Sequence, residues 1–198
     1  MNTLPETLGR FRVLAEIGRG GMGRVFEAHD PTLDRRVAIK TVWSGPGTAP
    51  PDVDSFVAEA RHTARLEHPA IVPIHEVGRT SQGEVFFVMR RVDGLTLREV
   101  LAALDRDDAT EAPGGWTRGR LLPAFVQICR AVDFAHESGV LHRDLKPDNL
   151  MLGRHGAVYV LDWGVARAMD GRPEPRRQPV AFAADGATVA AETVGTHG

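Results

Sequence analysis

Cysteine, excess charge and long apolar runs are scarce in this chain of 198 residues. Cys129 is the single cysteine, so the chain can form no internal disulfide and no cysteine-based metal site, which favours a reducing compartment. The formal net charge of -2 argues against nucleic-acid binding. No apolar stretch approaches the roughly 20 residues of a membrane-spanning helix. Residues 1–6 lack the basic start and apolar run of a signal peptide, so we expect a soluble protein.

Hydrophobic residues make up 42% of the chain, which is enough to bury the core of one or two small domains. Three stretches rich in Gly, Pro, Asp or Ala interrupt it and predict loops, at residues 44–54, 105–115 and 168–187. We find no internal repeat that would indicate a solenoid or propeller.

The first half of the chain contains short runs rich in β-branched and aromatic residues. These runs predict strands at residues 11–14, 25–28, 37–42, 74–77 and 85–89. Residues 56–66 contain few β-branched residues and end before a His-Pro pair, which predicts a helix. The turn at residues 81–83 favours a hairpin between the last two strands.

In the second half the apolar residues recur at helical spacing. This pattern predicts an amphipathic helix over residues 121–137, with the buried stripe Leu121, Phe125, Ile128, Val132 and Ala135. Cys129 lies beside that stripe, and we interpret it as a small buried hydrophobic residue. Two short strands are predicted at residues 150–152 and 158–161. A strand-rich half followed by a helix-led half suggests two lobes.

Residues 142–149, with the sequence HRDLKPDN, place three kinds of polar group in one short turn. The carboxylate of Asp144 could accept a proton from an attacking hydroxyl. Lys146 could neutralise a phosphate oxygen, and Asn149 could ligate a divalent cation. Each alone is an ordinary loop residue, but together they indicate a phosphoryl-transfer site.

A glycine cluster near the N-terminus provides a backbone that can approach phosphates closely. It consists of Gly18, Gly20, Gly21 and Gly23. A glycine-rich hairpin without a ligand and a dinucleotide-binding turn are the alternatives. The second alternative needs a helix directly after the last glycine, whereas residues 24–31 read as a strand halted by Asp-Pro. A hairpin that covers phosphates therefore fits better.

Strand alternation puts Ala38 and Lys40 on the same face of the strand at residues 37–42. A lysine on an apolar strand is costly to bury unless an acid pairs with it. Glu59, on the half-apolar face of the predicted helix, is the candidate partner. Further along, Asp162 follows a predicted strand and precedes Trp163 and Gly164, so its carboxylate could bind magnesium.

These motifs, in this order, resemble those of protein kinases, and most closely the bacterial serine/threonine kinases. In this family, Lys146 within the Asp-Leu-Lys-Pro run favours Ser/Thr over Tyr specificity. The resemblance implies an α+β fold with two lobes. We expect an N-terminal tail at residues 1–10, a complete N-terminal lobe at 11–92 and a partial, helical C-terminal lobe at 93–198. Trp163 stands where the family usually has Phe, and we expect it to keep the family's apolar contact with the helix that carries Glu59.

The resemblance also implies a role for each motif in binding ATP and Mg²⁺. Lys40, oriented by Glu59, would position the α and β phosphates, while Asp162 and Asn149 would hold Mg²⁺. Asp144 would deprotonate the substrate hydroxyl and Lys146 would stabilise the transferred group. The remaining nucleotide contacts would come from the glycines, Val25, Ala38, the gatekeeper Met89 and the hinge Arg90-Arg91-Val92.

Partners and context follow from the same resemblance. We expect a cytoplasmic chain that phosphorylates Ser or Thr of protein substrates, with a second copy as the partner that phosphorylates Thr188 or Thr193 in trans. Because the family's Ala-Pro-Glu motif does not follow Gly195-Thr196, we expect a fragment with little activity alone, from a longer protein in which another segment could provide a membrane anchor. Two alternatives are a nucleotide-binding module without catalysis and a small-molecule kinase.

Overall fold

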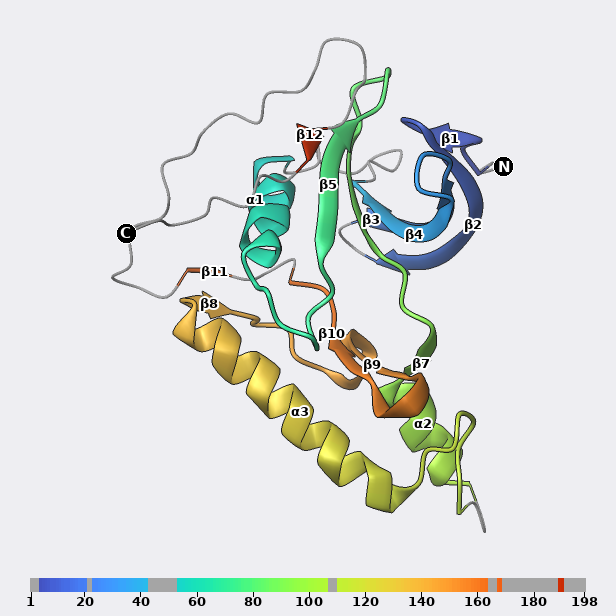
Figure 1. Cartoon of the computed structure of the whole chain (residues 1–198), viewed down its shortest axis with the longest axis vertical. Coiled ribbons are helices and arrows are strands. Elements are labelled where there is room, and N and C mark those ends of the chain that lie inside the picture. The colour runs from blue at the N-terminus through green and yellow to red at the C-terminus, as the bar shows by residue number, and fades with distance from the viewer. Residues whose placement is uncertain are drawn as a thin grey trace. The chain divides into compact units, whose positions relative to one another are not determined.

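The computed structural model of the chain describes residues 4–20, 23–42, 53–106, 110–163, 167–168 and 189–190. The chain splits into two compact units (Figure 1). The first comprises Met1–Arg65, Pro73–Arg91 and Pro175–Gly198, and the second comprises Leu66–Val72 and Val92–Glu174. Each unit is described by itself below. No helix in the described part of the chain is long and apolar enough to cross a membrane.

The first unit is built on a seven-stranded sheet with the strand order β1-β2-β3-β4-β6-β5-β12. All neighbouring strands are antiparallel. The strands are β1 (Thr7–Leu8), β2 (Phe11–Gly20), β3 (Gly23–Asp30), β4 (Arg35–Thr41), β5 (Ile74–Arg79), β6 (Val85–Arg90) and β12 (Val189–Ala190). The strands and the β5–β6 hairpin predicted from the sequence are confirmed.

Each face of this sheet buries its own apolar cluster. One face carries Phe11, Phe26, Val37, Ile39 and Phe86, among other fully buried side chains. The other face packs against α1 (Val53–Ala64), where the helix residues Phe56 and Ala60 meet Phe87 and Val85. The predicted helix is confirmed, although it begins and ends a few residues earlier than expected.

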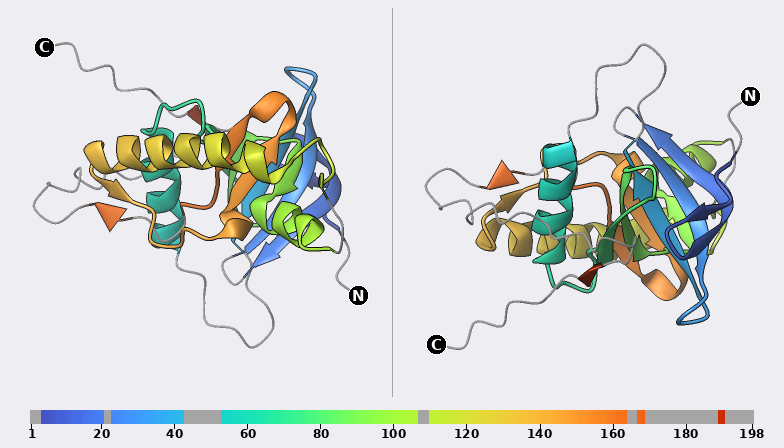
Figure 2. Two further views of the ribbon diagram at one scale, coloured as in Figure 1. Left: turned by 90° about the horizontal axis from the view of Figure 1, so that it is seen from below. Right: turned by 90° about the horizontal axis from the view of Figure 1, so that it is seen from above.

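The second unit combines two helices with short strands. The helices are α2 (Leu97–Leu104) and α3 (Arg118–Glu137), and 3-10 turns lie at η1 (Pro147–Asn149) and η2 (Arg154–Gly156). A three-stranded sheet has the order β10 (Val158–Val160), β9 (Leu150–Gly153) and β7 (Gly94–Thr96), and β8 (Val140–Leu141) pairs with β11 (Arg167–Ala168). Helix α3 runs along β8 and β10 (Figure 2).

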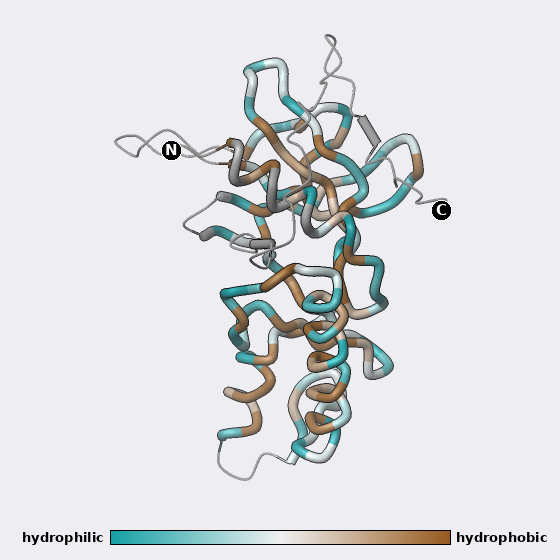
Figure 3. Tube along the Cα trace, turned by 90° about the vertical axis from the view of Figure 1, so that its left-hand side faces the viewer, coloured by the Kyte–Doolittle hydropathy of each residue, from teal (hydrophilic) through white to brown (hydrophobic). Residues whose placement is uncertain are grey.

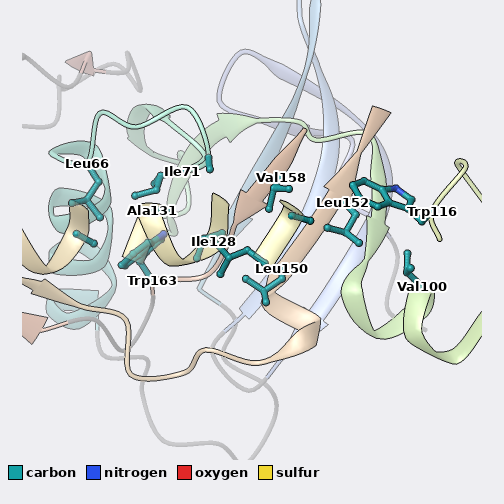
Figure 4. Close-up of a cluster of buried hydrophobic side chains, with 14 of the residues drawn as sticks. Leu66, Ile71, Val100, Trp116, Ile128, Ala131, Leu150, Leu152, Val158 and Trp163 are labelled. Carbon is teal, nitrogen blue, oxygen red and sulfur yellow. The ribbon is translucent and has the colours of Figure 1, made fainter. Parts of the chain in front are cut away.

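One apolar core holds the second unit together. Trp163 lies beside Ala131 of α3 at one end, and Trp116 lies near Leu152 at the other (Figure 4). Thr96 caps α2 with a capping box, in which Glu99 accepts a hydrogen bond from the Thr96 backbone. At the C-terminal end of α3 the chain turns through Gly139, whose positive φ of 78° suits glycine, as the sequence predicts.

Helix α3 buries most of the predicted stripe, because Ile128 and Ala135 are buried and Leu121 and Val132 are partly buried against the core. Its buried residues are Ala124, Ile128, Ala131 and Ala135, three of which are small alanines. Phe125, predicted to be buried, is 59% exposed, and Cys129 is exposed as well. Polar and apolar residues both occur around the helices (Figure 3). Neighbouring residues of a helix point about 100° apart, so the sequence alone can assign an apolar residue to the wrong side of the buried stripe. Leu122, Phe125 and Val126 leave apolar surface exposed on α3.

Candidate active site

Four predicted nucleotide-binding residues share one face of the sheet in the first unit. The register pairs Val25 of β3 with Lys40 of β4, and Ala38 of β4 with Met89 of β6. Paired residues in antiparallel strands point to the same side, and Ala38 and Lys40 are two positions apart on one strand. The sheet therefore brings these four side chains together, as strand alternation predicts for Ala38 and Lys40.

Helix α1 packs on the face that carries Lys40. The Lys40 ammonium is largely buried and lies 5.7 Å from the centre of the Phe87 ring, which stacks on Phe56 of α1 at 4.9 Å. Glu59 follows Phe56 by one turn of α1, but its side chain lies outside the described part of the structure. The Lys40–Glu59 ion pair stays a prediction.

The glycine cluster forms a hairpin between β2 and β3. Gly18 is paired with Val25, and Gly20 with Gly23, so a strand rather than a helix follows the last glycine. This topology excludes the dinucleotide-binding turn. A Cβ atom on Gly23 would lie 1.9 Å from the Thr41 carbonyl oxygen, so this position requires glycine. Gly21 lies outside the described residues.

An ion cluster braces this hairpin on the opposite face from Val25. The carboxylate of Glu16 accepts hydrogen bonds from Arg19 Nε at 2.7 Å and from Arg24 Nε at 2.9 Å. Hydrogen bonds from Arg19 and then Arg24 lower the pKa of Glu16 to about 2. The Arg24 guanidinium also lies over the Phe26 ring, 4.6 Å from its centre. Sequence reasoning missed this cluster.

In the second unit the polar groups of residues 142–149 form one connected set. Lys146 Nζ donates to Asp144 Oδ2 at 2.6 Å, and Asn149 Nδ2 donates to the same oxygen at 3.1 Å and to the Asp144 carbonyl at 2.8 Å. The hydrogen bond from Lys146 is the main cause that lowers the pKa of Asp144, and the same bond raises the pKa of Lys146. Asp144 is therefore ionised at neutral pH.

His142 links this loop to the residue before Asp162. Burial is the main cause that lowers the pKa of His142, so the ring is neutral near pH 7. Its Nε2–H donates to the Leu161 carbonyl at 2.8 Å, which leaves Nδ1 to accept the Asp144 backbone N–H at 3.3 Å. The Leu161 N–H in turn donates to the Asn149 carbonyl at 2.8 Å. Both polar groups of the Leu161 backbone are thus anchored to this loop.

Asp162 and Trp163 follow this anchored residue and point to different environments. Asp162 is exposed and has a positive φ of 58°, an uncommon backbone conformation for a residue other than glycine. Trp163 is buried, and its ring centre lies 4.5 Å from that of His142. Trp163 belongs to the core of this unit, whereas its expected contact with α1, a helix of the first unit, stays a prediction. Gly164 lies outside the described residues.

The donor set of this region fits a magnesium ion that also binds phosphates. Asn149 uses its amide nitrogen for Asp144, which leaves its carbonyl oxygen, the atom that a hard cation prefers, outside those hydrogen bonds. Asp162 supplies a carboxylate anchored close by through Leu161. The described residues contain no cluster of three or more His, Cys, Asp or Glu that could hold a metal alone. Two protein ligands are what Mg²⁺ needs when phosphates complete its shell.

Two further sets of ion pairs near these residues were not predicted. Glu27, on the face with Ala38, pairs with Arg36 and Arg91. Arg98 of α2 pairs with Asp148, next to Asn149. No local signal in the sequence marks either set, because the partners meet only through strand register or through tertiary packing. The predicted phosphorylation sites Thr188 and Thr193 lie outside the described residues.

Comparison with known proteins decides the family. A sequence model described as the protein kinase domain matches residues 11–197. The chain belongs to the protein kinase family. This match confirms the resemblance on which the predicted fold and site depend.

Similar kinases come from several bacteria. The chain is 38% identical over 174 residues to the serine/threonine-protein kinase PknD of Protochlamydia amoebophila, covering 86% of this chain and 18% of that kinase. It is 40% identical over 164 residues to a probable serine/threonine-protein kinase of Streptomyces coelicolor, covering 81% of this chain and 23% of that one. The chain thus spans less than a quarter of the length of these two relatives.

A solved structure confirms the kinase fold. The crystal structure of a mutant of the Mycobacterium tuberculosis PknI kinase domain is similar, with a TM-score of 0.62 and 28% sequence identity. The match covers 85% of this chain and 65% of the PknI chain. The predicted α+β kinase-like fold, with a β-sheet unit followed by a helical unit, is therefore correct.

Proposed function

We propose that this kinase-family chain carries the ATP-binding and phosphoryl-transfer residues of a protein serine/threonine kinase. The observation that carries the proposal is the connected set of Asp144, Lys146 and Asn149. The Asp144 carboxylate accepts hydrogen bonds from both the Lys146 ammonium and the Asn149 carboxamide. Phosphoryl transfer needs a proton acceptor, a cation for the transferred group and an oxygen ligand for the metal. These three side chains match those needs one by one.

The first unit would bind the nucleotide through the face described above. Val25, Ala38 and Met89 offer an apolar surface for adenine, and the backbone of Val92 offers hydrogen bonds to its edge. Lys40, oriented by Glu59, would bind the α and β phosphates. The backbone of the glycine hairpin would cover the phosphates, with Gly18, Gly20, Gly21 and Gly23 allowing close approach.

The second unit would carry the transfer step. Asp144 accepts the proton of a Ser or Thr hydroxyl while the hydroxyl oxygen forms a bond to the γ-phosphorus of ATP. The bond from that phosphorus to the oxygen of the leaving ADP breaks in the same step. Lys146 neutralises charge on the transferred group. Bound Mg²⁺ supplies charge neutralisation on the phosphates, and Asn149 and Asp162 are the residues that would hold it.

The proposal extends to partners and location. The substrates are proteins with Ser or Thr, and a second copy of the kinase is the partner that phosphorylates Thr188 or Thr193 in trans. An arginine next to the catalytic aspartate, Arg143, would pair with that phosphate. We place the activity in the cytoplasm, where ATP is available. The lobes would be residues 11–92 and 93–198, after a tail at residues 1–10.

A second candidate function is ATP binding without turnover. The same nucleotide-binding residues would serve it, because ATP and Mg²⁺ can bind whether or not transfer follows. Two assays separate the candidates. The first measures binding of ATP with Mg²⁺ by isothermal titration calorimetry, and the second measures transfer of labelled γ-phosphate to casein and histone.

The assays compare three proteins, namely the unchanged chain, Asp144→Asn and Asp133→Asn. Asp133 is an exposed aspartate of α3 and serves as the matched control. A kinase transfers label to Ser or Thr, and Asp144→Asn loses transfer while it keeps ATP binding, whereas Asp133→Asn keeps both. Binding without transfer in the unchanged chain would support the second candidate. Absence of binding would contradict both.

A further inference from the structure

Glu27 is a buried acid on the face that we assign to the nucleotide. It is paired with Ala38 in the register of β3 and β4, and Ala38 is paired with Met89 of β6. These three side chains therefore form one row across three strands. Glu27 is only 7% exposed. An ionised group at such a position is costly unless other charges compensate it.

Two arginines form ion pairs with Glu27, one at each oxygen of its carboxylate. Arg36 Nη1 lies 2.7 Å from Glu27 Oε1, and Arg91 Nε lies 3.0 Å from Glu27 Oε2. Burial opposes ionisation of Glu27, but Arg91 and Arg36 outweigh it, so the net pKa of this carboxyl is below its usual value. The Arg36 side chain is 67% exposed, whereas that of Arg91 is 25% exposed. Arg91 is therefore the more enclosed of the two partners.

Arg91 differs from Arg36 in the backbone that it anchors. Arg36 belongs to β4 and is paired with His29 of β3, so the sheet already fixes its backbone. Strand β6 ends at Arg90, and residues 91–93 belong to no helix or strand. The ion pair with Glu27 therefore ties Arg91 to the sheet just where the hydrogen-bonded ladder stops.

We propose that Glu27 is a positioning residue for nucleotide binding, which acts by holding Arg91 and hence the backbone of residues 90–92 in the geometry that adenine requires. The inference rests on the proposed function, because it assumes that this backbone binds adenine. Glu27 itself need not touch the nucleotide. Glu27 affects nucleotide affinity through its ion pair with Arg91 alone, so a variant of Arg36 should not reproduce this effect.

The test measures binding of adenosine and of ADP with Mg²⁺ by calorimetry, with Arg91→Ala, Arg36→Ala and Lys40→Met in the full chain. We expect Arg91→Ala to weaken both ligands by about fivefold, the factor that corresponds to an ion pair of ordinary strength. Lys40→Met should weaken ADP but not adenosine, because adenosine has no phosphate. Arg36→Ala, the matched control, should leave both affinities within about twofold, which is inside the usual effect of an exposed charge.

Further variants guard against general destabilisation. Arg91→Lys keeps the charge and should restore part of the affinity for adenosine. In a Glu27→Gln background, Arg91→Ala should cause little additional loss, because the pair is already broken. Circular dichroism melting identifies any variant that fails to fold, and Glu27→Gln, which breaks the same ion pair and should weaken adenosine binding, then takes the place of Arg91→Ala.

The outcomes distinguish the inference from the function on which it rests. If the unchanged chain binds neither ligand, the proposed function is wrong and the inference falls with it. If the unchanged chain binds both and Arg91→Ala binds adenosine equally well, the inference alone is wrong. An equal loss in Arg36→Ala and Arg91→Ala would also overturn it, because Glu27 would then need only neutralisation.

Discussion

Arg98 of α2 and Asp148 of η1, 50 residues apart in the sequence, form a bidentate ion pair. Arg98 Nε lies 2.5 Å from Asp148 Oδ1, and Nη2 lies 2.6 Å from Oδ2. The strands next to them are paired as well, since Thr96 of β7 is opposite Met151 of β9. The capped start of α2 therefore holds the turn that carries Asn149, a candidate magnesium ligand.

We predict that Arg98→Ala raises the pKa of Asp148 toward its ordinary value. The hydrogen bond from Arg98 is the main cause that lowers this pKa, and its loss removes that cause. The pKa of Asp144 should stay low, because it is lowered mainly by the hydrogen bond from Lys146, which Arg98→Ala leaves in place. Carboxyl ¹³C NMR titration measures both values. Arg130→Ala, which removes an exposed arginine of α3, is the control, and an unchanged Asp148 titration would contradict the prediction.

Two glycines of the hairpin should respond in different ways to alanine. At Gly23 the new Cβ would meet the Thr41 carbonyl at 1.9 Å, so Gly23→Ala should destabilise folding by more than about 1 kcal/mol. At Gly18 the nearest atom is Val25 Cβ at 3.5 Å, an ordinary contact. Gly18→Ala should therefore fold normally.

Urea denaturation and ADP binding together test this pair of variants. Gly18→Ala should keep its unfolding midpoint yet bind ADP more weakly, because its methyl group would separate the backbone from the phosphates. Gly23→Ala should show a lower midpoint. Equal midpoints for the two variants would contradict the assigned roles.

The longer strands, the helices α1 and α3 and the contiguous motifs could be predicted because their signals are local, whereas α2 and the shortest strands were not predicted. The Asp144, Lys146 and Asn149 set lies within one turn, and Ala38 and Lys40 share a face by simple alternation. The ion pairs of Glu16 and Glu27, and the pair between Arg98 and Asp148, were not predicted. Their partners meet only through strand register or tertiary packing. Only the relative placement of several strands or helices shows which arginine meets which carboxylate.

Glu16 illustrates this limit and gives a pH prediction. Its folded pKa of about 2 lies below the ordinary value of 4.5, because Arg19 and Arg24 donate to the carboxylate. A lowered folded pKa contributes stability that is present above the unfolded pKa and is lost as pH falls toward the folded pKa. The difference in melting temperature between the unchanged chain and Glu16→Gln should therefore be largest near neutral pH.

The pH window follows from the same two values. The difference should shrink as pH falls from about 4.5 toward about 2, because the unchanged chain then takes up a proton on Glu16. Melting curves followed by circular dichroism at several pH values measure it. Arg19→Gln should show a smaller version of the same trend, since Arg24 remains. A difference that is constant across this window would contradict the prediction.

The α3 helix shows the other way in which local reasoning fails. Periodicity predicts the helix and most of its buried stripe, since Leu121, Ile128, Val132 and Ala135 belong to the core or pack against it, but it places Phe125 wrongly. Side-chain volume, which periodicity does not show, also enters, because α3 places the small residues Ala124, Ala131 and Ala135 in the core beside Ile128.

This interpretation predicts different costs for two large-to-small changes on α3. Ile128→Ala should lower the free energy of unfolding by about 2 to 5 kcal/mol, because it opens a cavity among buried side chains. Phe125→Ala should change it by no more than about 0.5 kcal/mol, because Phe125 is 59% exposed. Urea denaturation of the full chain compares the two. A larger loss for Phe125→Ala would mean that the stripe containing Phe125, not the alanine stripe, faces the core, because the cost of truncation follows burial rather than residue size.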